Sequence, residues 1–312
     1  MSSLTIRLFG KFSAELDGRR LTGLDSGKLQ ELFCYLLLNR RRPQSRELLA
    51  ALLWGESPTT QSKKYLRQAL WQLQNIIGSA ERKQDDRLLL IDADWVNVNA
   101  LSDYWFDVSE FEQSYDEAHG ARGQYFEAGT AERVARAIEL YRGELLEGCY
   151  DEWCLVERER LQNMYLMMLD KLMAYSEAAE HFDAGIGYGA KILSCDRARE
   201  HTHRRLMRIY YLAGDRTSAL RQYDRCVAAL SEELGVKPAR KTSQLFEQIR
   251  SDRLEAAYPT ATSDSQSTPI PQIREALGRL RQVKTALVDF HRQIKHDIQA
   301  LEVLVKGKRD GG

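Results

Sequence analysis

Residues 61–77 have the sequence QSKKYLRQALWQLQNII, and the spacing of the apolar residues in this stretch predicts an amphipathic helix. The positions expected to face inward are Leu66, Ala69, Leu70, Leu73 and Ile77. Basic, amide and aromatic side chains lie away from that apolar stripe: Lys63, Lys64, Arg67, Gln68, Trp71 and Gln72. A solvated helix face rarely carries a tryptophan, so this composition favours a surface that contacts a partner over an ordinary solvent-exposed face.

Two shorter helices are expected before this segment and a β-hairpin after it. Leu29, Leu32 and Phe33 recur at helical spacing, and Ser45 is a favourable N-cap for a second helix over residues 46–54. After the third helix, residues 87–91 and 95–99 are two short apolar runs separated by a turn, Asp92-Ala93-Asp94. Helix, turn, basic-polar helix and hairpin form the order of a winged helix-turn-helix, which lays one helix in the major groove of double-stranded DNA.

The polar residues of the third helix suit both parts of DNA recognition. Arg67 and Gln68 are residue types that bond the edges of guanine and adenine, whereas Lys63 and Lys64 suit phosphates. The loop Arg40-Arg41-Arg42, before the second helix, could clamp a phosphate or could be an ordinary charged loop, and the sequence leaves both alternatives open. The candidate DNA-binding residues are Lys63, Lys64, Arg67, Gln68, Trp71, Gln72, Arg46, Arg41 and Arg42.

The start of the chain predicts a small antiparallel sheet. Residues 4–9 and 12–16 alternate apolar and polar side chains, and Asp17-Gly18 is a strong hairpin signal. With the helices and hairpin above, residues 1–100 are therefore expected to form a winged-helix DNA-binding domain.

Residues 101–255 have helical periodicity throughout and contain an internal repeat of about 35 residues. Leu172, Tyr175, Ala184, Tyr188 and Ile192 recur as Met207, Tyr210, Ala219, Tyr223 and Val227. Helix pairs that repeat at this length are typical of tetratricopeptide arrays, in which each pair buries its apolar face against its neighbour. Residues 185–190, GIGYGA, match a dinucleotide-binding fingerprint by letter, but no strand precedes them, so we expect a turn between two repeat helices.

The last part of the chain has two kinds of sequence. Residues 256–271 are rich in Ser, Thr and Pro and predict a linker. Residues 272–306 carry an apolar residue at every a position of five heptads and predict a C-terminal helix, a possible coiled coil. Asp297 occupies a d position and interrupts one apolar layer. The expected fold is thus mainly α, with a small sheet and winged helix, helical repeats and this final helix.

The net charge is zero over 312 residues, but it is unevenly distributed. Residues 1–100 hold 15 Lys and Arg against 11 Asp and Glu, whereas residues 101–255 hold 21 against 28. Within residues 39–67 there are seven basic residues and two acidic ones. The basic charge is therefore local, as a DNA-docking surface requires.

Other function classes find little support. The five cysteines, an odd number mostly within helical patterns, are expected to be small buried residues in a reducing compartment. The chain start does not resemble a secretory signal, and no apolar run could cross a bilayer, so we expect a cytoplasmic protein without a membrane partner. No set of residues suggests catalysis, a cofactor site or a metal site. No receiver domain precedes the winged helix, so no phosphoacceptor is expected to control it.

Several motifs, in a fixed order, resemble one known family. Residues 28–32, 52–55 and 66–73 are similar to an OmpR-like winged helix. Five later segments resemble the bacterial transcriptional activation domain: DVSEFE (107–112), YRGELL (141–146), DEW (151–153), ERERL (157–161) and EELGVKP (232–238). Together they resemble the antibiotic-regulatory, SARP-type activators over about residues 4–250.

The resemblance implies a DNA-binding transcriptional activator whose helical domain aids dimerisation and contact with RNA polymerase. We expect it to bind a repeated DNA site as a homodimer. If the protein is regulated, we expect the signal, a small-molecule or protein ligand, to be received in the groove of the helical repeats or by the C-terminal helix; the alternative that the groove is only a scaffold stays equally open. Two features depart from the family: Gln72 and Gln74 are neutral where arginine is usual, and the wing tip at residues 92–94 is acidic. These departures keep a second hypothesis open, a helical-repeat adaptor whose winged helix docks a protein. A DNA-binding assay would distinguish the two.

Overall fold

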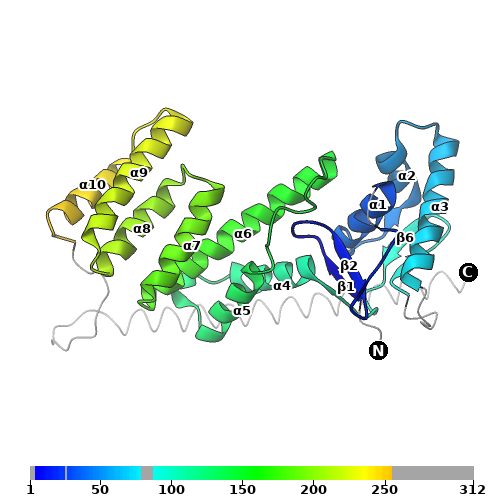
Figure 1. The fold of residues 1–312 in the computed structure, drawn as a ribbon, viewed down its shortest axis with the longest axis horizontal. Coiled ribbons are helices and arrows are strands. Elements are labelled where there is room, and N and C mark those ends of the chain that lie inside the picture. Colours follow the sequence, from blue (N-terminus) through cyan, green and yellow to red (C-terminus); the bar gives the residue numbers. More distant parts are fainter. Residues whose placement is uncertain (1–3, 25–26, 79–86, 255–312) are drawn as a thin grey trace, which may run out of the picture. The chain divides into compact units, whose positions relative to one another are not determined.

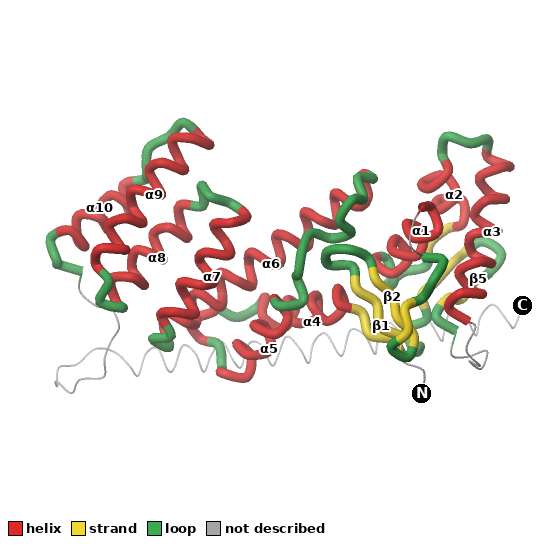
Figure 2. Tube along the Cα trace, viewed as in Figure 1, coloured by secondary structure: helices red, strands yellow, loops and turns green. Residues whose placement is uncertain are grey.

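The computed structural model describes residues 4–24, 27–78 and 87–254. These residues belong to one compact unit, residues 1–255. The predicted linker at residues 256–271 and the predicted helix at residues 272–306 lie outside the described residues. Figure 1 shows the course of the chain and Figure 2 shows its helices and strands.

The first part of the unit is mixed and the second is helical, in agreement with the predicted mainly α class. The strands are β1 (Leu4–Arg7), β2 (Ser13–Leu16), β3 (Arg19–Arg20), β4 (Gln44–Ser45), β5 (Leu89–Ile91), β6 (Trp95–Val98) and β7 (Tyr104–Phe106). The helices of the first part are α1 (Gly27–Leu38), α2 (Arg46–Trp54) and α3 (Thr59–Gly78). Those of the second part are α4 (Asp107–His119), the 3-10 turn η2 (Gly123–Tyr125), α5 (Ala128–Ile138), α6 (Glu152–Ala178), α7 (Phe182–Cys195), α8 (Glu200–Leu212), α9 (Arg216–Leu234) and α10 (Arg240–Arg250).

The N-terminal sheet has the order β3-β2-β1-β7. Its predicted hairpin is present: Asp17 and Gly18 have φ values of 52° and 75°, the left-handed conformation that a two-residue hairpin turn requires. The fourth strand, β7, was not predicted. It pairs in parallel with β1, with Ile6 opposite Phe106, so that a segment beyond residue 100 completes this sheet.

The winged helix has the predicted order of elements. Ser45 caps α2 by accepting a hydrogen bond from the backbone N–H of Glu47, and α2 covers the predicted residues 46–54. The hairpin of β5 and β6 forms as predicted and gains a third strand, because β4 pairs with β6. The predicted inward residues of α3 are all buried: Leu66, Ala69, Leu70, Leu73 and Ile77.

A buried carboxylate, that of Asp107, joins the N-terminal sheet to the helical part. Asp107 is 2% exposed and is the first residue of α4. Its carboxylate accepts hydrogen bonds from the backbone N–H groups of Leu8, at 2.8 Å, and Phe9, at 3.0 Å. It also accepts one from Val108, at 2.8 Å. The chain leaving β1 is therefore held at the N-terminus of α4 by one side chain.

Helices α6, α7, α8 and α9 pack side by side in chain order, as a helical-repeat array does (Figure 1). The repeat length is 34 rather than 35, since α7 begins at Phe182 and α9 at Arg216. The five predicted pairs, each 35 residues apart, are therefore one residue out of register, as Ile192 and Val227 show. Ile192 is buried and corresponds to the buried Cys226, whereas Val227 is exposed.

The predicted turn at residues 185–190 is also wrong, because these residues lie inside α7. Gly185 and Gly189 are buried where α7 packs on α8. A Cβ at Gly185 would lie 3.1 Å from Cδ1 of Ile209, and one at Gly189 would lie 2.6 Å from Cδ2 of Leu206. These glycines thus allow close helix packing rather than a turn, and patterns of letters alone do not distinguish the two uses.

Gly123 offers a test of such packing. It is buried in η2, and a Cβ there would overlap the backbone carbonyl oxygen of Lys171 in α6. We expect Gly123→Ala to lower the free energy of unfolding by about 1–3 kcal/mol, because backbone must move. Gly187→Ala is the matched control, because Gly187 lies in α7 and no atom is near the new methyl group. This variant should have a free energy of unfolding up to about 1 kcal/mol higher than wild type, since alanine favours a helix more than glycine does. Chemical denaturation of both variants would measure this, and a Gly123→Ala protein as stable as wild type would contradict the packing.

Candidate nucleic-acid interface

One face of α3 carries the predicted reading residues. Lys64, Arg67, Gln68 and Trp71 are exposed and follow each other at spacings of three, one and three residues, so they form one stripe. Trp71 is 64% exposed although it is the largest side chain of the helix. Asn75 extends the stripe by one turn; it was not predicted, although the same periodicity points to it.

The stripe is basic and its charges are not neutralised locally. Neither Lys64 nor Arg67 forms an ion pair with another residue in the described part of the chain. Lys63 differs, because its ammonium lies 2.7 Å from the carboxylate of Glu47 in α2. The hydrogen bond from Lys63 lowers the pKa of Glu47. Gln72 is half-buried at the edge of the stripe. The stripe can therefore offer two free cations and an amide to a ligand.

The N-terminus of α3 is fixed by Ser62. Its side chain is buried, and its hydroxyl lies 2.8 Å from the backbone carbonyl of Trp54 and 3.1 Å from that of Ser57. The rings of Trp54 and Tyr65 also meet, with centroids 6.4 Å apart. These contacts join the end of α2 to the first turns of α3. A fixed helix is what base reading requires, because hydrogen bonds to base edges tolerate little displacement.

Arg46 and Arg42 lie beside the wing rather than on α3. The guanidinium of Arg46 donates to the backbone carbonyl of Asp92, at 2.9 Å, and its own N–H donates to that of Asp94. Arg46 thereby attaches α2 to the acidic wing tip. Arg42 is exposed in the loop before β4. Six predicted residues thus lie on α3, four of them in the stripe, and these two lie elsewhere.

Arg41 contacts the helical part of the chain. It lies 3.4 Å from the carboxylate of Glu112 and 3.8 Å from that of Asp116, both in α4. Arg40 and Arg160 also bind Glu112, at 2.6 and 2.7 Å. The loop Arg40-Arg41-Arg42 therefore connects the winged helix to α4. Arg41 would have to leave these carboxylates to reach a phosphate.

The electrostatics of Glu112 support this anchoring role. Its side chain is 8% exposed, and burial alone would raise its pKa. The positive charges of Arg40 and Arg160 outweigh that effect, so the pKa of Glu112 is below its ordinary value. Glu112 therefore stays ionised near neutral pH and holds these arginines.

Other kinds of site find no support in the described residues. No group of His, Cys, Asp and Glu side chains there is arranged to hold a metal ion. None of the helices that the structure describes is long and apolar enough to cross a membrane. All five cysteines are free, and Cys34, Cys154 and Cys226 are buried.

The chain is similar to known regulatory proteins and matches one family model. Residues 106–250 match the family model of the bacterial transcriptional activator domain. The chain is 25% identical to the regulatory protein AfsR of Streptomyces coelicolor over 272 residues, 84% of this chain and 26% of AfsR. It is 26% identical to the transcriptional regulatory protein EmbR of Mycobacterium tuberculosis over 271 residues, 83% of this chain and 67% of EmbR. The chain thus spans about a quarter of the length of AfsR and about two thirds of that of EmbR.

A third relative and a solved structure agree with these matches. The transcriptional regulatory protein MoaR1 of Mycobacterium tuberculosis is 22% identical over 250 residues, 79% of each chain. The structure of Mycobacterium tuberculosis EmbR, in complex with a low-affinity phosphopeptide, superposes with a TM-score of 0.63. That match covers 82% of this chain and 67% of EmbR, at 20% identity. It confirms the predicted architecture.

Proposed function

We propose that this chain, a SARP-type regulator with a bacterial transcriptional activator domain at residues 106–250, is a DNA-binding activator that reads double-stranded DNA with α3. The observation that carries the proposal is the exposed stripe of Lys64, Arg67, Gln68 and Trp71 on a fixed helix of a winged helix. The cations of the stripe can bind phosphates or base edges, its amide can bond a base edge, and its aromatic ring can pack on a sugar. Lys63, Gln72, Arg42 and Arg46 would contact the flanking backbone.

We assign a different role to each part of the unit. Residues 1–100 would bind DNA, and the acidic helical residues 101–255 would contact RNA polymerase, a partner that the family implies. The buried ion pair of Arg40 with Glu112 and the bonds of Asp107 would keep the two parts in one arrangement on the promoter. A bacterial regulator of this kind acts in the cytoplasm and needs no catalytic site.

Selection from a pool of randomised double-stranded DNA would test the function. The full chain should enrich a motif that occurs twice per bound fragment, and binding should weaken steeply with salt. Arg67→Ala should lose the enrichment, whereas Arg19→Ala, an exposed arginine of the N-terminal sheet, should keep it. Failure of the wild-type chain to enrich any motif would favour the adaptor hypothesis, in which the winged helix docks a protein.

Dimerisation is proposed through the heptads of residues 272–306. An unbroken apolar a column is best buried against a second copy, and two-fold symmetry would present two α3 helices to repeated half-sites. Leu287→Asp should abolish the dimer, since it places a charge in an a position. Asp297→Leu should strengthen it, because two carboxylates would no longer face each other.

Sedimentation of the full chain measures this prediction. Thr285→Asp is the control, because residue 285 is an f position of the same heptads and faces away from the proposed seam. A truncation after residue 257 should behave like Leu287→Asp. The same mass for wild type and Leu287→Asp would show that this segment is not the dimerisation element.

A further inference from the structure

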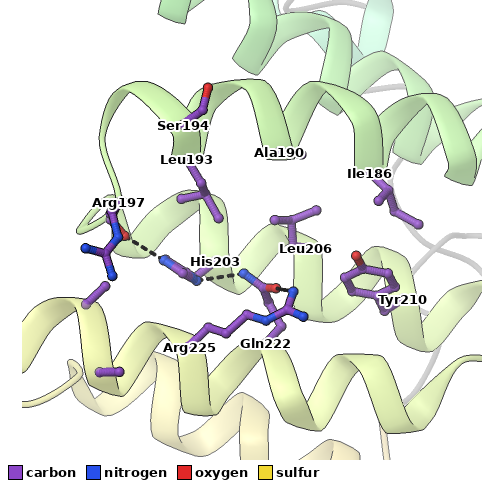
Figure 3. A pocket seen from close by; sticks show the side chains of 12 residues that line it. Ile186, Ala190, Leu193, Ser194, Arg197, His203, Leu206, Tyr210, Gln222 and Arg225 are labelled. Atoms are coloured by element: carbon purple, nitrogen blue, oxygen red, sulfur yellow. Dashed lines mark hydrogen bonds between the residues drawn. The ribbon is translucent and has the colours of Figure 1, made fainter.

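A groove of about 440 Å³ lies between α7, α8 and α9, within the repeats. Figure 3 shows its two unlike sides. Apolar side chains of α7 and α8 form one side, among them Ile186, Ala190, Leu193 and Leu206. The other side is formed by polar side chains of the α7–α8 loop, α8 and α9, together with the small apolar side chains of Ala228 and Ala229 in α9. A ligand that fills the groove must therefore be apolar on one side and polar on the other.

The polar side is a connected chain of hydrogen bonds. His203 and Gln222, only 3% and 2% exposed, bond to each other with Nδ1 and Nε2 2.7 Å apart. The other ring nitrogen of His203 lies 2.8 Å from the backbone carbonyl of Arg197, which makes that nitrogen the donor and Nδ1 the acceptor. The amide oxygen of Gln222 then accepts from Arg225, at 3.3 Å. Two buried side chains thus hold the Arg225 guanidinium beside the groove.

The charge of the lining is unusual for this part of the chain. Residues 101–255 carry seven more acidic than basic residues, yet no carboxylate is among the lining side chains of this groove. The guanidinium of Arg197 forms ion pairs with the carboxylates of Glu232, at 3.2 Å, and Glu233, at 3.8 Å. Arg225 has no carboxylate partner among the described residues, so it is the available cation of the groove.

We propose that this groove binds a small organic anion, a single carboxylate, sulfonate or phosphate group attached to an apolar body. The anionic group would bond Arg225, and the apolar body would lie against Ile186, Leu193 and Leu206. One available cation and this volume suit a small molecule better than an acidic peptide, which would need several cations. The inference deepens the proposed function, because it names the chemical class of a signal that such a regulator would receive.

The test compares two probes with the same aromatic body. These are 1-anilinonaphthalene-8-sulfonate, an anion, and N-phenyl-1-naphthylamine, which lacks the sulfonate. Both fluoresce in apolar surroundings, and both are titrated into the full chain without DNA, so the outcome does not depend on the proposed DNA binding. We expect one sulfonate probe per chain, bound about tenfold more tightly than the neutral probe, which is the gain from one charge-assisted hydrogen bond.

Three variants locate the site. Arg225→Gln should weaken the sulfonate probe about tenfold and leave the neutral probe unchanged. Arg221→Gln, an exposed arginine one turn earlier on α9 and outside the lining, should change neither. Ala190→Trp should exclude both probes, because Ala190 is exposed to the groove and the indole would fill it. Since Arg225 is an exposed surface residue, Arg225→Gln keeps the proposal testable if Ala190→Trp does not fold.

Several results would overturn the proposal. Equal affinity for both probes, or no effect of Arg225→Gln, would show that the groove has no anion site. Binding that survives Ala190→Trp in a folded protein would place the probe elsewhere. Displacement of the sulfonate probe by a polyglutamate peptide but not by decanoate would replace the small anion with an acidic peptide as the ligand.

Discussion

Replacing Asp107 with alanine is expected to lower the free energy of unfolding by about 2–4 kcal/mol. The substitution leaves the backbone N–H groups of Leu8 and Phe9 without the acceptor that they share, and both residues are buried. An unsatisfied buried donor costs about 1–3 kcal/mol. Asp103→Ala is the matched control, because Asp103 is exposed four residues earlier, and it should change stability little. Chemical denaturation followed by circular dichroism measures both, and equal stabilities for the two variants would contradict the role of Asp107.

The same residue predicts a pH dependence. Burial raises the pKa of Asp107 to about 6, against the opposing effect of the bonds from Phe9, Leu8 and Val108. The folded chain therefore binds a proton more tightly than the unfolded chain between about pH 4 and pH 6. The stability that comes from protonation of Asp107 is fully present below the pKa of an aspartate in the unfolded chain, and it is lost as the pH rises through about 6.

Comparison with Asp107→Asn isolates that contribution, because asparagine does not titrate. The stability of wild type relative to Asp107→Asn should be greater at pH 5 than at pH 7. The opposite trend would mean that the three N–H bonds dominate over burial and that the pKa of the carboxyl lies below its usual range.

Features specified by neighbouring residues were predictable from the sequence. The helix α2 was placed correctly because a capping serine and an apolar period act within one turn. The stripe on α3 was found for the same reason, since Lys64, Arg67, Gln68 and Trp71 need only helical geometry to lie together. Local periodicity therefore predicts which side chains share a face.

Features that depend on contacts between residues far apart in the sequence were not predictable from it. The strand β7 has three residues and exists because β1 offers it a partner about 100 positions earlier in the chain. Arg41 was predicted to be a candidate phosphate contact, but its acidic partner Glu112 lies 71 residues away and was visible only in the structure. The glycines of α7 were interpreted as a turn because the packing of Leu206 on Gly189 cannot be read from either residue alone.

Base reading by α3 gives the second large expected effect. Arg67→Ala should weaken binding to the selected DNA site by about 1–3 kcal/mol and relax the preference at one base pair, since a bidentate base contact contributes that much discrimination. Adding Gln68→Ala should remove preference at a second position. Because Arg67 has no ion-pair partner in the described residues, its loss leaves no buried charge and should not change stability.

Lys64→Ala is the matched comparison on the same stripe, because a lysine suits a phosphate rather than a base edge. It should weaken binding to every sequence alike and reduce the slope of log affinity against log salt by about one. Arg67→Ala should instead lose more affinity for the selected site than for random DNA. Fluorescence anisotropy with both kinds of DNA, at several salt concentrations, separates the two effects. If both variants bind both DNAs as wild type does, α3 is not the reading helix. The exposed Trp71 would then have to serve a protein partner, as the adaptor hypothesis requires.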